Sequence, residues 1–397
     1  MHIFVIMKRI IFAAVALFVC IICMAQQPRK AKIQYGPWIQ NVSETGFTVI
    51  FKTTEPTLAY VEVAPEDGSS MYNSDLPRFY ETVAGRRVHG TIHRIRVSGL
   101  QPGTPYRYRI VGKVALDDSY AYGIVWGPEL KITGEIKGIK TLDLNAKECR
   151  FSVVNDIHCK TGRYTALTKD LKPEDLDFFV MNGDMASYVN SLDTMIRYTF
   201  GPAKDLLQSV PSIYVRGNHE SRGREFHLVP SIFDSPTGEF YFMFRQGPCA
   251  FLVLDGGEDK TDASGEYFGT ADFDTYRGIE LEWLKKAVED PLFKSAPWRI
   301  ALIHIPTISH IEPWYAQQWL CDNMLPVLNA AGVDLMISGH HHKYIYTAPG
   351  AEGNRNAFPI LINSNTDRLD CVVSEKQITA RIFNEDGKEV HSLSFKK

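Results

Sequence analysis

The sequence predicts two domains in tandem, an N-terminal β-sandwich followed by an α/β domain. In the first part, apolar and polar side chains alternate with a period of two, as in half-buried strands. In the second part, apolar runs end abruptly in polar residues and are separated by helix-like segments, which is typical of sheets covered on both faces. The chain of 397 residues, 45% of them hydrophobic, can build two or three domains with ordinary cores.

The charge balance is close to neutral. The formal net charge is -3, and no long basic run or basic face is visible in the sequence. The composition therefore gives no electrostatic reason to expect nucleic acid or an anionic membrane surface as a partner. A small anionic substrate stays compatible with this balance, because a bound metal can supply positive charge locally.

The N-terminus has the composition of a signal peptide. Lys8 and Arg9 precede an apolar run over 10–24, which is shorter than the ~20 apolar residues that a spanning helix needs. We expect residues 1–25 to be removed near Ala25 and the mature protein to be exported, to the periplasm or beyond. The alternative is an uncleaved anchor.

The cysteines do not indicate a disulfide framework. Beyond the N-terminal run the chain has five, which are widely spaced and form no CxxC pair: Cys149, Cys159, Cys249, Cys321 and Cys371. An odd number leaves at least one thiol unpaired within the chain, and most are expected to be small core hydrophobes.

The predicted sandwich covers residues 32–136. Its strands are expected over 46–51, 59–63, 93–97 and 106–110. The segment 99–106, in which Leu100 and a turn precede Tyr106, resembles the fibronectin type III pattern. Nothing in this part looks like a catalytic cluster, so we expect it to support the site or frame the substrate. Two glycines amid charges in the run 134–140 indicate a linker between the domains, which we place at 137–147.

Five apolar runs of the second domain, over 148–397, each end beside metal-capable residues. The runs are 151–154, 178–181, 212–215, 300–303 and 333–337. Ligands of α/β sheets bind beyond the carboxyl ends of the strands, so these five ends should converge on one site. A helix is expected over 279–288, and a closing hairpin over 377–383 with a turn at Asp386 and Gly387.

Histidines are concentrated at these strand ends. A single histidine there is usually structural, but five of the chain's 12 follow predicted strands: His158, His219, His304, His340 and His342. Gly183, Gly217 and Gly339 each adjoin a candidate ligand, where the backbone must turn tightly and let a bound group approach. Alone, each would be an ordinary turn glycine; together they favour a site.

The order of these motifs resembles the metallophosphoesterase superfamily, the calcineurin-like phosphoesterases. The motifs are Asp156-x-His158, Gly183-Asp184, the run 217–220 (GNHE), His304-x-Pro306 and Gly339-His340-x-His342. With a sandwich in front, the architecture is similar to that of purple acid phosphatases and their bacterial-type homologues. The resemblance implies a four-layer α-β-β-α sandwich for the second domain.

The resemblance also implies a dinuclear metal centre. One ion would be held by Asp156, His158 and His342, the other by Asn218, His304 and His340, with Asp184 bridging the two. Imidazole, carboxylate and amide oxygen donors suit Fe, Mn or Zn. Two such ions bind and deprotonate a water and neutralise charge on a phosphoryl group.

Several residues are candidates for substrate chemistry. We expect His219 to protonate the leaving oxygen or to stabilise the transition state, the alternative being that it only packs. Candidates for substrate binding are Arg222, Arg224, His227 and His310, although the first three are equally compatible with a solvated loop; Trp314 and Tyr315 are candidates for lining a pocket.

The motifs depart from those of purple acid phosphatases at one position. The resemblance places their iron-bound tyrosine three residues after the bridging aspartate, where this chain has Ser187, with Tyr188 one residue later. His158 is also present where the purple enzymes lack a histidine. We therefore expect no Fe(III)–tyrosinate colour.

The sequence thus predicts an exported, metal-dependent phosphomonoesterase in which a metal-bridging water attacks a small phosphate ester. The alternatives are a phosphodiesterase or nucleotide phosphoesterase with the same centre, and a non-catalytic exported binding protein. If the triplet 340–342 is extended, His340 and His342 face the metals and His341 faces away.

Overall fold

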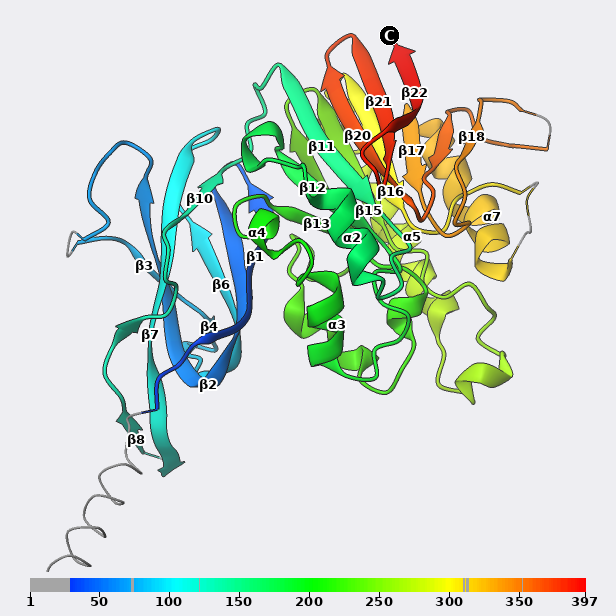
Figure 1. Ribbon diagram of the computed structural model, residues 1–397. Helices are drawn as coiled ribbons and strands as arrows, with labels where there is room; N and C mark the ends of the chain where they lie inside the picture. The colour runs from blue at the N-terminus through cyan, green and yellow to red at the C-terminus, as the bar shows by residue number, and fades with distance from the viewer. Residues whose placement is uncertain (1–28, 73–74, 121, 310, 312–313, 352) are drawn as a thin grey trace, which may run out of the picture.

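An antiparallel N-terminal sheet and a pair of mixed sheets lie side by side in the computed structural model (Figure 1). The structure describes residues 29–397 except 73–74, 121, 310, 312–313 and 352. The predicted signal peptide and His310 lie outside the described residues. Within the described ranges, no helix combines the length and apolarity needed to cross a membrane.

The N-terminal part is built almost entirely from antiparallel strands and is compatible with a β-sandwich. Its strands are β1 (Ile33–Ser43), β2 (Gly46–Pro65), β3 (Arg78–Tyr80), β6 (Gly90–Ser98), β7 (Pro105–Tyr120), β8 (Gly123–Trp126), β9 (Leu130–Lys131) and β10 (Lys137–Lys140), with a separate pair β4 (Thr82–Val83) and β5 (Arg86–Arg87). The first half of β2 pairs with β1 and β6, and the second half pairs with β7. One long strand thus connects two groups of partners.

Two expectations for this part were wrong. The strands predicted over 46–51 and 59–63 are one continuous strand, β2, because a bulge between Lys52 and Thr57 passes the chain from β6 to β7 without a turn. The linker predicted from residue 137 begins later, because Lys137–Lys140 pairs with β7 as strand β10. In the fibronectin-like segment the Tyr106 hydroxyl accepts a hydrogen bond from Gln101 N at 2.9 Å, which ties the start of β7 to the preceding turn.

The C-terminal part contains two six-stranded sheets. The first has the order β13 (Ser212–Val215), β12 (Phe178–Asn182), β11 (Glu148–Val154), β20 (Asp367–Ser374), β21 (Gln377–Asn384) and β22 (Glu389–Lys396); the second has the order β14 (Phe242–Gln246), β15 (Cys249–Leu254), β16 (Trp298–Ile303), β17 (Leu335–Ser338), β19 (Ile360–Ile362) and β18 (Ile345–Thr347). Strands β11 to β13 are parallel to one another, and so are β15, β16, β17 and β19. The expected closing hairpin is β21 and β22.

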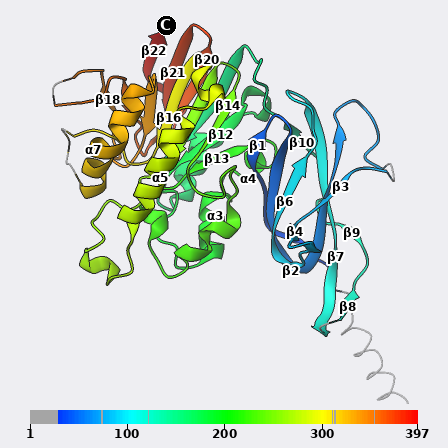
Figure 2. The ribbon, with the colours of Figure 1, turned by 180° about the vertical axis from the view of Figure 1, so that it is seen from behind.

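Helices cover the outer faces of both sheets (Figure 2). They are α2 (Thr161–Thr168), α3 (Leu192–Thr199), α4 (Lys204–Leu207), α5 (Phe273–Ala287), α6 (Pro291–Lys294) and α7 (Tyr315–Ala330), with short 3₁₀ turns η1 (Pro173–Asp175), η2 (His219–Ser221), η3 (Phe226–Ile232) and η4 (Gly265–Tyr267). The helix expected over 279–288 is the second half of α5.

The side chains of each strand alternate between two apolar layers. Phe151 of β11 meets Phe251 of β15 edge to face between the sheets, with ring centroids 5.3 Å apart. The next residues along the strands point outward, against α2 and α3 on the first sheet and against α5 and α7 on the second. This arrangement is the predicted four-layer α-β-β-α sandwich, and it leaves the ends of the parallel strands as the place where polar groups can gather.

The two parts of the chain are joined by a packed interface. Trp38 of β1 stacks on Phe200, which follows α3, with ring centroids 4.1 Å apart and planes 10° apart. Its indole Nε1 donates to the Ile232 carbonyl at 3.2 Å, and the Tyr108 hydroxyl donates to the Gln208 carbonyl at 2.7 Å. The N-terminal sheet therefore lies against the helices beside β13.

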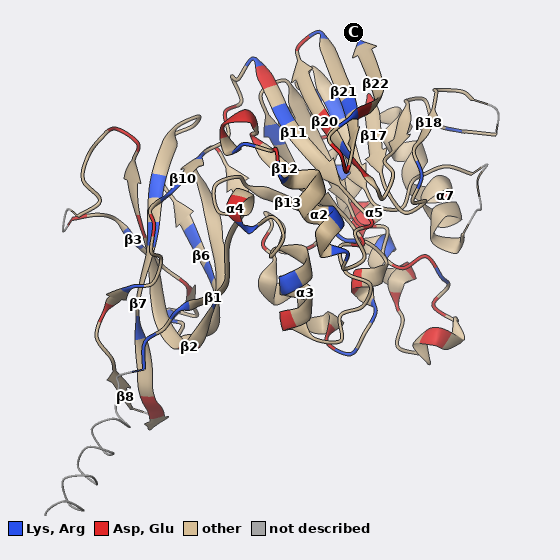
Figure 3. Cartoon of the chain, viewed as in Figure 1, with Lys and Arg blue, Asp and Glu red and all other residues tan. Residues whose placement is uncertain are grey.

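The cysteines and the distribution of charge agree with what the sequence predicts. All five described cysteines are free, and all but Cys159 are buried, as expected of small core side chains. Acidic and basic residues are interspersed over both parts of the chain (Figure 3), in keeping with the near-neutral net charge.

Replacing Trp38 tests the interface between the two parts. Trp38 is 1% exposed, so Trp38→Ala leaves a cavity and an unpaired Ile232 carbonyl, and we expect the free energy of unfolding to fall by about 3–5 kcal/mol. Urea unfolding followed by circular dichroism measures the change. Tyr120→Ala is the matched aromatic control, since Tyr120 is 76% exposed and its loss should change stability by less than about 0.5 kcal/mol. A Trp38→Ala change as small as the control would show that the interface contributes little.

Candidate metal centre

Five strand ends converge at one place, as the sequence predicts. Asp156 and His158 follow β11, Asp184 follows β12, and Asn218 follows β13 in the first sheet. His304 follows β16, and His340 and His342 follow β17 in the second sheet. The carboxyl ends of the parallel strands lie at the same edge of both sheets. Residues far apart in the chain therefore come into contact, such as Asp156 and His342, which are 186 positions apart.

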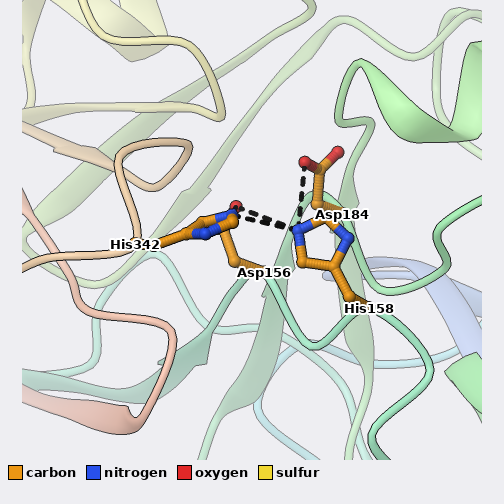
Figure 4. Close-up of side chains that lie close together, drawn as sticks. All are labelled: Asp156, His158, Asp184 and His342. Atoms are coloured by element: carbon orange, nitrogen blue, oxygen red, sulfur yellow. Dashed lines mark hydrogen bonds and ion pairs between the residues drawn. The ribbon is translucent and has the colours of Figure 1, made fainter.

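Four side chains form the first metal-capable group (Figure 4). Ligand atoms of Asp156, His158, Asp184 and His342 all lie within 4.8 Å of one another. The His342 Nε2 atom is 3.2 Å from Asp156 Oδ1 and 3.0 Å from His158 Nε2, and His158 Nε2 is 3.7 Å from Asp184 Oδ2. Two carboxylates and two imidazoles thus surround a space of the size that a metal ion requires.

The second group shares Asp184 with the first. Ligand atoms of Asp184, His304 and His340 lie within the same 4.8 Å limit. His304 Nε2 is 3.2 Å from Asp184 Oδ2, and His340 Nδ1 is 3.2 Å from Asn218 Oδ1, which brings the amide oxygen to this group. A carboxylate common to both groups is what a pair of ions needs as a bridge.

Hydrogen bonding inside the cluster is incomplete without a cation. The His304 Nδ1 atom lies 2.8 Å from the Asn182 carbonyl and donates to it, so in the neutral ring Nε2 directs a lone pair toward the Asp184 carboxylate. His304 Nε2, Asp156 Oδ1 and His340 Nε2 are buried and make no hydrogen bond among the described residues. Buried polar atoms are rarely left in this state, and a metal ion would satisfy atoms of this donor set.

The backbone of the candidate ligands is in the left-handed region. Nine described residues other than glycine have positive φ angles, and five of them are candidate ligands: Asp156 (53°), His158 (47°), Asp184 (54°), His340 (74°) and His342 (59°). Each costs roughly 1–2 kcal/mol relative to a right-handed conformation. Strain of this kind persists where the surroundings impose it, and it is concentrated here at one site.

The histidine triplet is therefore not an extended segment. Strand β17 ends at Ser338, and two left-handed residues flank His341. We expected successive side chains of an extended segment to point to opposite sides. This prediction was wrong, because tight turns rather than a pleated strand direct His340 and His342 toward the cluster. The assignment of one histidine to each group nevertheless agrees with the geometry.

Glycines allow the close approach that the sequence predicts. A Cβ on Gly217 would lie 2.2 Å from Asp184 Oδ1, and one on Gly339 would lie 2.7 Å from Asp156 Oδ2. A Cβ on Gly183 would lie 2.4 Å from His304 Nδ1, and its φ of +84° also favours glycine. A side chain at any of the three would displace a candidate ligand.

Burial and mutual electrostatic interactions shift the pKa values of the clustered side chains. Burial opposes ionisation of Asp156 and Asp184, but the surrounding histidines, His304 foremost, together outweigh it and lower the pKa of both carboxyls. For His304, burial favours the neutral ring, yet the two carboxylates raise its pKa to about 10. Burial lowers the pKa of His158 to about 4 and that of His340 to about 3, so both are neutral imidazoles at pH 7 and available as ligands.

Glu220 supports the bridging carboxylate from behind. Its carboxylate accepts from the backbone amides of Asp184 at 3.0 Å, Ala186 at 3.1 Å and Gly217 at 3.0 Å. Burial, together with the nearby Asp184 charge, raises the pKa of Glu220 to about 7. Glu220 thereby ties together the loops that follow β12 and β13.

Sequence reasoning missed the acidic pair that orients the outer residues of the site. Asp259 Oδ2 accepts from Asn218 Nδ2 at 3.2 Å, which turns the Asn218 amide oxygen toward His340. Glu258 forms a two-point ion pair with Arg222, at 2.8 and 2.6 Å. These residues lie in a loop after β15 with no motif, and an acidic dipeptide shortly after a buried strand is a signal too common to have identified them.

His219 and Arg222 meet beside the first group. The His219 Nδ1 atom donates to the Ser187 carbonyl at 2.9 Å, and its Nε2 atom lies 3.0 Å from Arg222 Nη1 and 3.9 Å from Asp184 Oδ2. In this arrangement the neutral His219 ring accepts from Arg222 at Nε2. Both side chains lie at the edge of the metal-capable cluster.

The other predicted substrate contacts are dispersed. Arg224 is exposed and donates to the Asn190 carbonyl at 2.9 Å, and the exposed His227 ring contacts Phe226. Trp314 reaches the site, with its ring 4.7 Å from that of His340, whereas the Tyr315 hydroxyl donates to Asp274. His310 lies outside the described residues.

Comparisons with known proteins agree with this geometry. The model of the calcineurin-like phosphoesterase family matches residues 149–344. Purple acid phosphatase 15 of Arabidopsis thaliana is 25% identical over 325 residues, covering 72% of this chain and 52% of the relative; purple acid phosphatase 23 of the same plant is 24% identical over 324 residues, covering 72% and 60%. The chain thus spans little more than half the length of these relatives.

A solved structure shows the same fold. The purple acid phosphatase PPD1 from yellow lupin (Lupinus luteus) seeds superposes with a TM-score of 0.63 at 15% sequence identity, and the match covers 92% of this chain and 75% of that one. The similarity includes the N-terminal part, since residues 149–344 alone are about half of the chain.

Metal content tests the assignment of the triplet. His340→Ala and His342→Ala each remove a ligand from a different group, so we expect each variant to retain about half of the metal bound by the unmodified protein. Elemental analysis of the dialysed proteins measures this loss. His341→Ala is the matched control and should retain the full content. Equal loss in all three variants, or loss in His341→Ala alone, would contradict the assignment.

Proposed function

We propose that this protein hydrolyses a small phosphate monoester at a dinuclear metal centre. Residues 149–344 form a calcineurin-like phosphoesterase domain, and the chain is related to purple acid phosphatases. The observation that carries the proposal is the sharing of Asp184 between two groups of metal-capable side chains. Separate sites on unrelated loops would not produce a shared carboxylate.

The metal ions would supply two things that the side chains cannot. A pair of divalent ions neutralises charge on the phosphoryl oxygens and makes a water acidic enough to react at neutral pH. Asp156, His158, His342 and Asp184 would hold one ion, and Asn218, His304, His340 and Asp184 the other. The mixture of imidazole, carboxylate and amide donors, without thiolate, fits Fe, Mn or Zn.

The reaction we propose is in-line attack of water on phosphorus. The bond between phosphorus and the ester oxygen breaks, and the leaving oxygen needs a proton. Because the Ser187 carbonyl holds the His219 ring at Nδ1, its Nε2 atom is directed at the cluster. His219 can deliver a proton from Nε2 only when that atom is protonated, which requires that Arg222 no longer donates to it, so we assign Arg222 to a phosphoryl oxygen of the bound substrate.

The completeness of the site favours an enzyme over a non-catalytic binding protein. All seven candidate ligands have metal-competent side chains, and they meet at the converging strand ends. Binding proteins derived from enzymes are expected to have lost some of these ligands. A phosphodiesterase with the same centre is the alternative, and the assay below distinguishes it from a monoesterase.

Export is a further part of the proposal. It rests on the basic residues and short apolar run at the N-terminus of the sequence, which lie outside the described residues. Secretion of the full-length chain with cleavage near Ala25, measured by N-terminal sequencing, is the expected result. A full-length chain that stays with the membrane would favour the anchor instead.

An assay with aryl phosphate monoesters and diesters tests the catalytic proposal. We expect monoester hydrolysis that disappears on chelation and returns with Mn, Fe or Zn, and a loss of at least about a hundredfold in Asp184→Ala because both ions lose a ligand. Glu239→Ala, a change at an exposed carboxylate with no role in the site, is the control. Hydrolysis that ignores chelation or persists in Asp184→Ala would exclude the dinuclear mechanism, and a preference for diesters would replace the monoesterase with a phosphodiesterase.

The absorption spectrum tests the ligand set. Tyr188 is 56% exposed, and its ring lies beside His219, 6.0 Å between centroids, so we expect no Fe(III)–tyrosinate band in the iron-loaded protein. Visible absorption of the iron-loaded protein and of Tyr188→Phe provides the measurement. A purple preparation whose colour vanishes in Tyr188→Phe would mean that Tyr188 binds iron.

A further inference from the structure

We propose that an aromatic cleft beside His219 holds the leaving group, so that the substrates are monophosphate esters with a flat aromatic ring in the alcohol portion. The inference rests on the proposed function, because it takes the phosphoryl group to lie at the metal centre. It adds a binding site and a substrate class that the ligand cluster does not define.

Four aromatic side chains and one cation line the cleft. Tyr188, Phe226, Tyr267, Phe268 and Arg222 line a single cavity of about 410 Å³. A cavity of this size lies within the range of small-molecule sites and holds one or two rings. The four aromatic residues come from three loops, which follow β12, β13 and β15, so the cleft is assembled by the fold.

Three of the four aromatic side chains of the cleft are exposed, and Tyr267 is half-buried. Tyr188 is 56% exposed, Phe226 46% and Phe268 91%. Phe268 has a left-handed backbone (φ +48°) directly after the short turn η4, a conformation that disfavours a bulky residue and that presents its ring outward. Three exposed aromatic side chains around one cavity form an apolar surface that a flat ring would cover.

The cleft adjoins the reacting side of the metal centre. Arg222 lines the cleft, and its Nη1 atom lies 3.0 Å from His219 Nε2. The Tyr188 ring is centred 6.0 Å from the His219 ring. A phosphoryl group held by the metals and Arg222 with its leaving oxygen toward His219 directs the rest of the substrate into this cleft.

Charge limits the substrate to a single phosphate. Among the described residues that line the cleft, Arg222 is the one cation, and the two-point ion pair with Glu258 balances its charge. Glu266 also lines the cleft and carries the opposite charge. A second phosphate in the leaving group would find no unmatched cation there, so a neutral ring is the better fit.

Kinetics of Phe268→Ala test the cleft. Phe268 is almost fully exposed, so its removal should leave the fold intact. We expect kcat/KM for phenyl phosphate or adenosine 5′-monophosphate, divided by kcat/KM for glycerol 1-phosphate, to fall about two- to tenfold, the value of one ring contact. Phe268→Tyr should restore the ratio, and Tyr120→Ala, which removes an exposed aromatic residue of the N-terminal part, should leave it unchanged.

The choice of aromatic substrate identifies the ring. A loss confined to phenyl phosphate indicates an aryl ester, and a loss confined to the nucleotide indicates a nucleobase. A ratio that is unchanged for both substrates in Phe268→Ala and in the double variant Phe226→Ala/Phe268→Ala overturns the inference.

A binding measurement separates this inference from the proposed function. Phenylphosphonate and methylphosphonate have no ester bond to hydrolyse, and isothermal titration of the metal-loaded protein gives their affinities. We expect phenylphosphonate to bind more tightly, with the difference reduced in Phe268→Ala. That result without turnover of any ester would retain the cleft and reject the hydrolase, whereas turnover with equal affinities would retain the hydrolase and reject the cleft.

Discussion

The structure depends on the placement of two carboxylates, Asp156 and Asp184, in a buried cluster of imidazoles. Both are almost fully excluded from solvent, and their oxygens lie within 4.8 Å of candidate histidine ligands. Two ionised carboxylates in such a place are stable only when positive charge lies between them. A proton on His304 can supply part of that charge, and two metal ions supply it more fully, with the amide of Asn218 and the neutral imidazoles completing their ligand sets.

The fold holds the carboxylates in position by accepting strained backbone conformations in the loops that converge on the site. Parallel strands in two facing sheets direct five loops to one place, and the loops reach the cluster through left-handed residues and glycines that no other residue could replace without a clash. Glu220 ties two of the loops together through backbone amides, while Asp259 and Glu258 orient Asn218 and Arg222 from outside. Two of these loops, after β12 and β13, continue into the aromatic cleft, and the loop after β15 that carries Glu258 and Asp259 also contributes Phe268. The proposed phosphate site and the proposed site of the leaving group thus share two loops.

The parts of this arrangement that were predictable from sequence are those with a local signature. A buried parallel strand followed by Asp-x-His or Gly-Asp is visible as an apolar run with a polar end, and the direction of α/β sheets then predicts that such ends meet. The continuous course of β2 was not predictable in the same way, because Thr53 to Pro56 resembles a turn and only pairing with β6 and β7 shows that the strand continues. The left-handed turns around His341 were also missed, since histidine has no strong preference for them. Asp259 and Phe268 act through contacts made by a long loop, and such contacts depend on the folded chain rather than on any pattern in the loop itself.

The most direct test of the central claim is the location of metal in crystals of the loaded protein. Anomalous scattering at the absorption edge of the added metal should give two peaks about 3.5–4 Å apart, with the Asp184 carboxylate between them and His342 and His340 on opposite sides. A single peak, or a pair of peaks that Asp184 does not bridge, would contradict the account, because the shared carboxylate would then serve some purpose other than joining two ions.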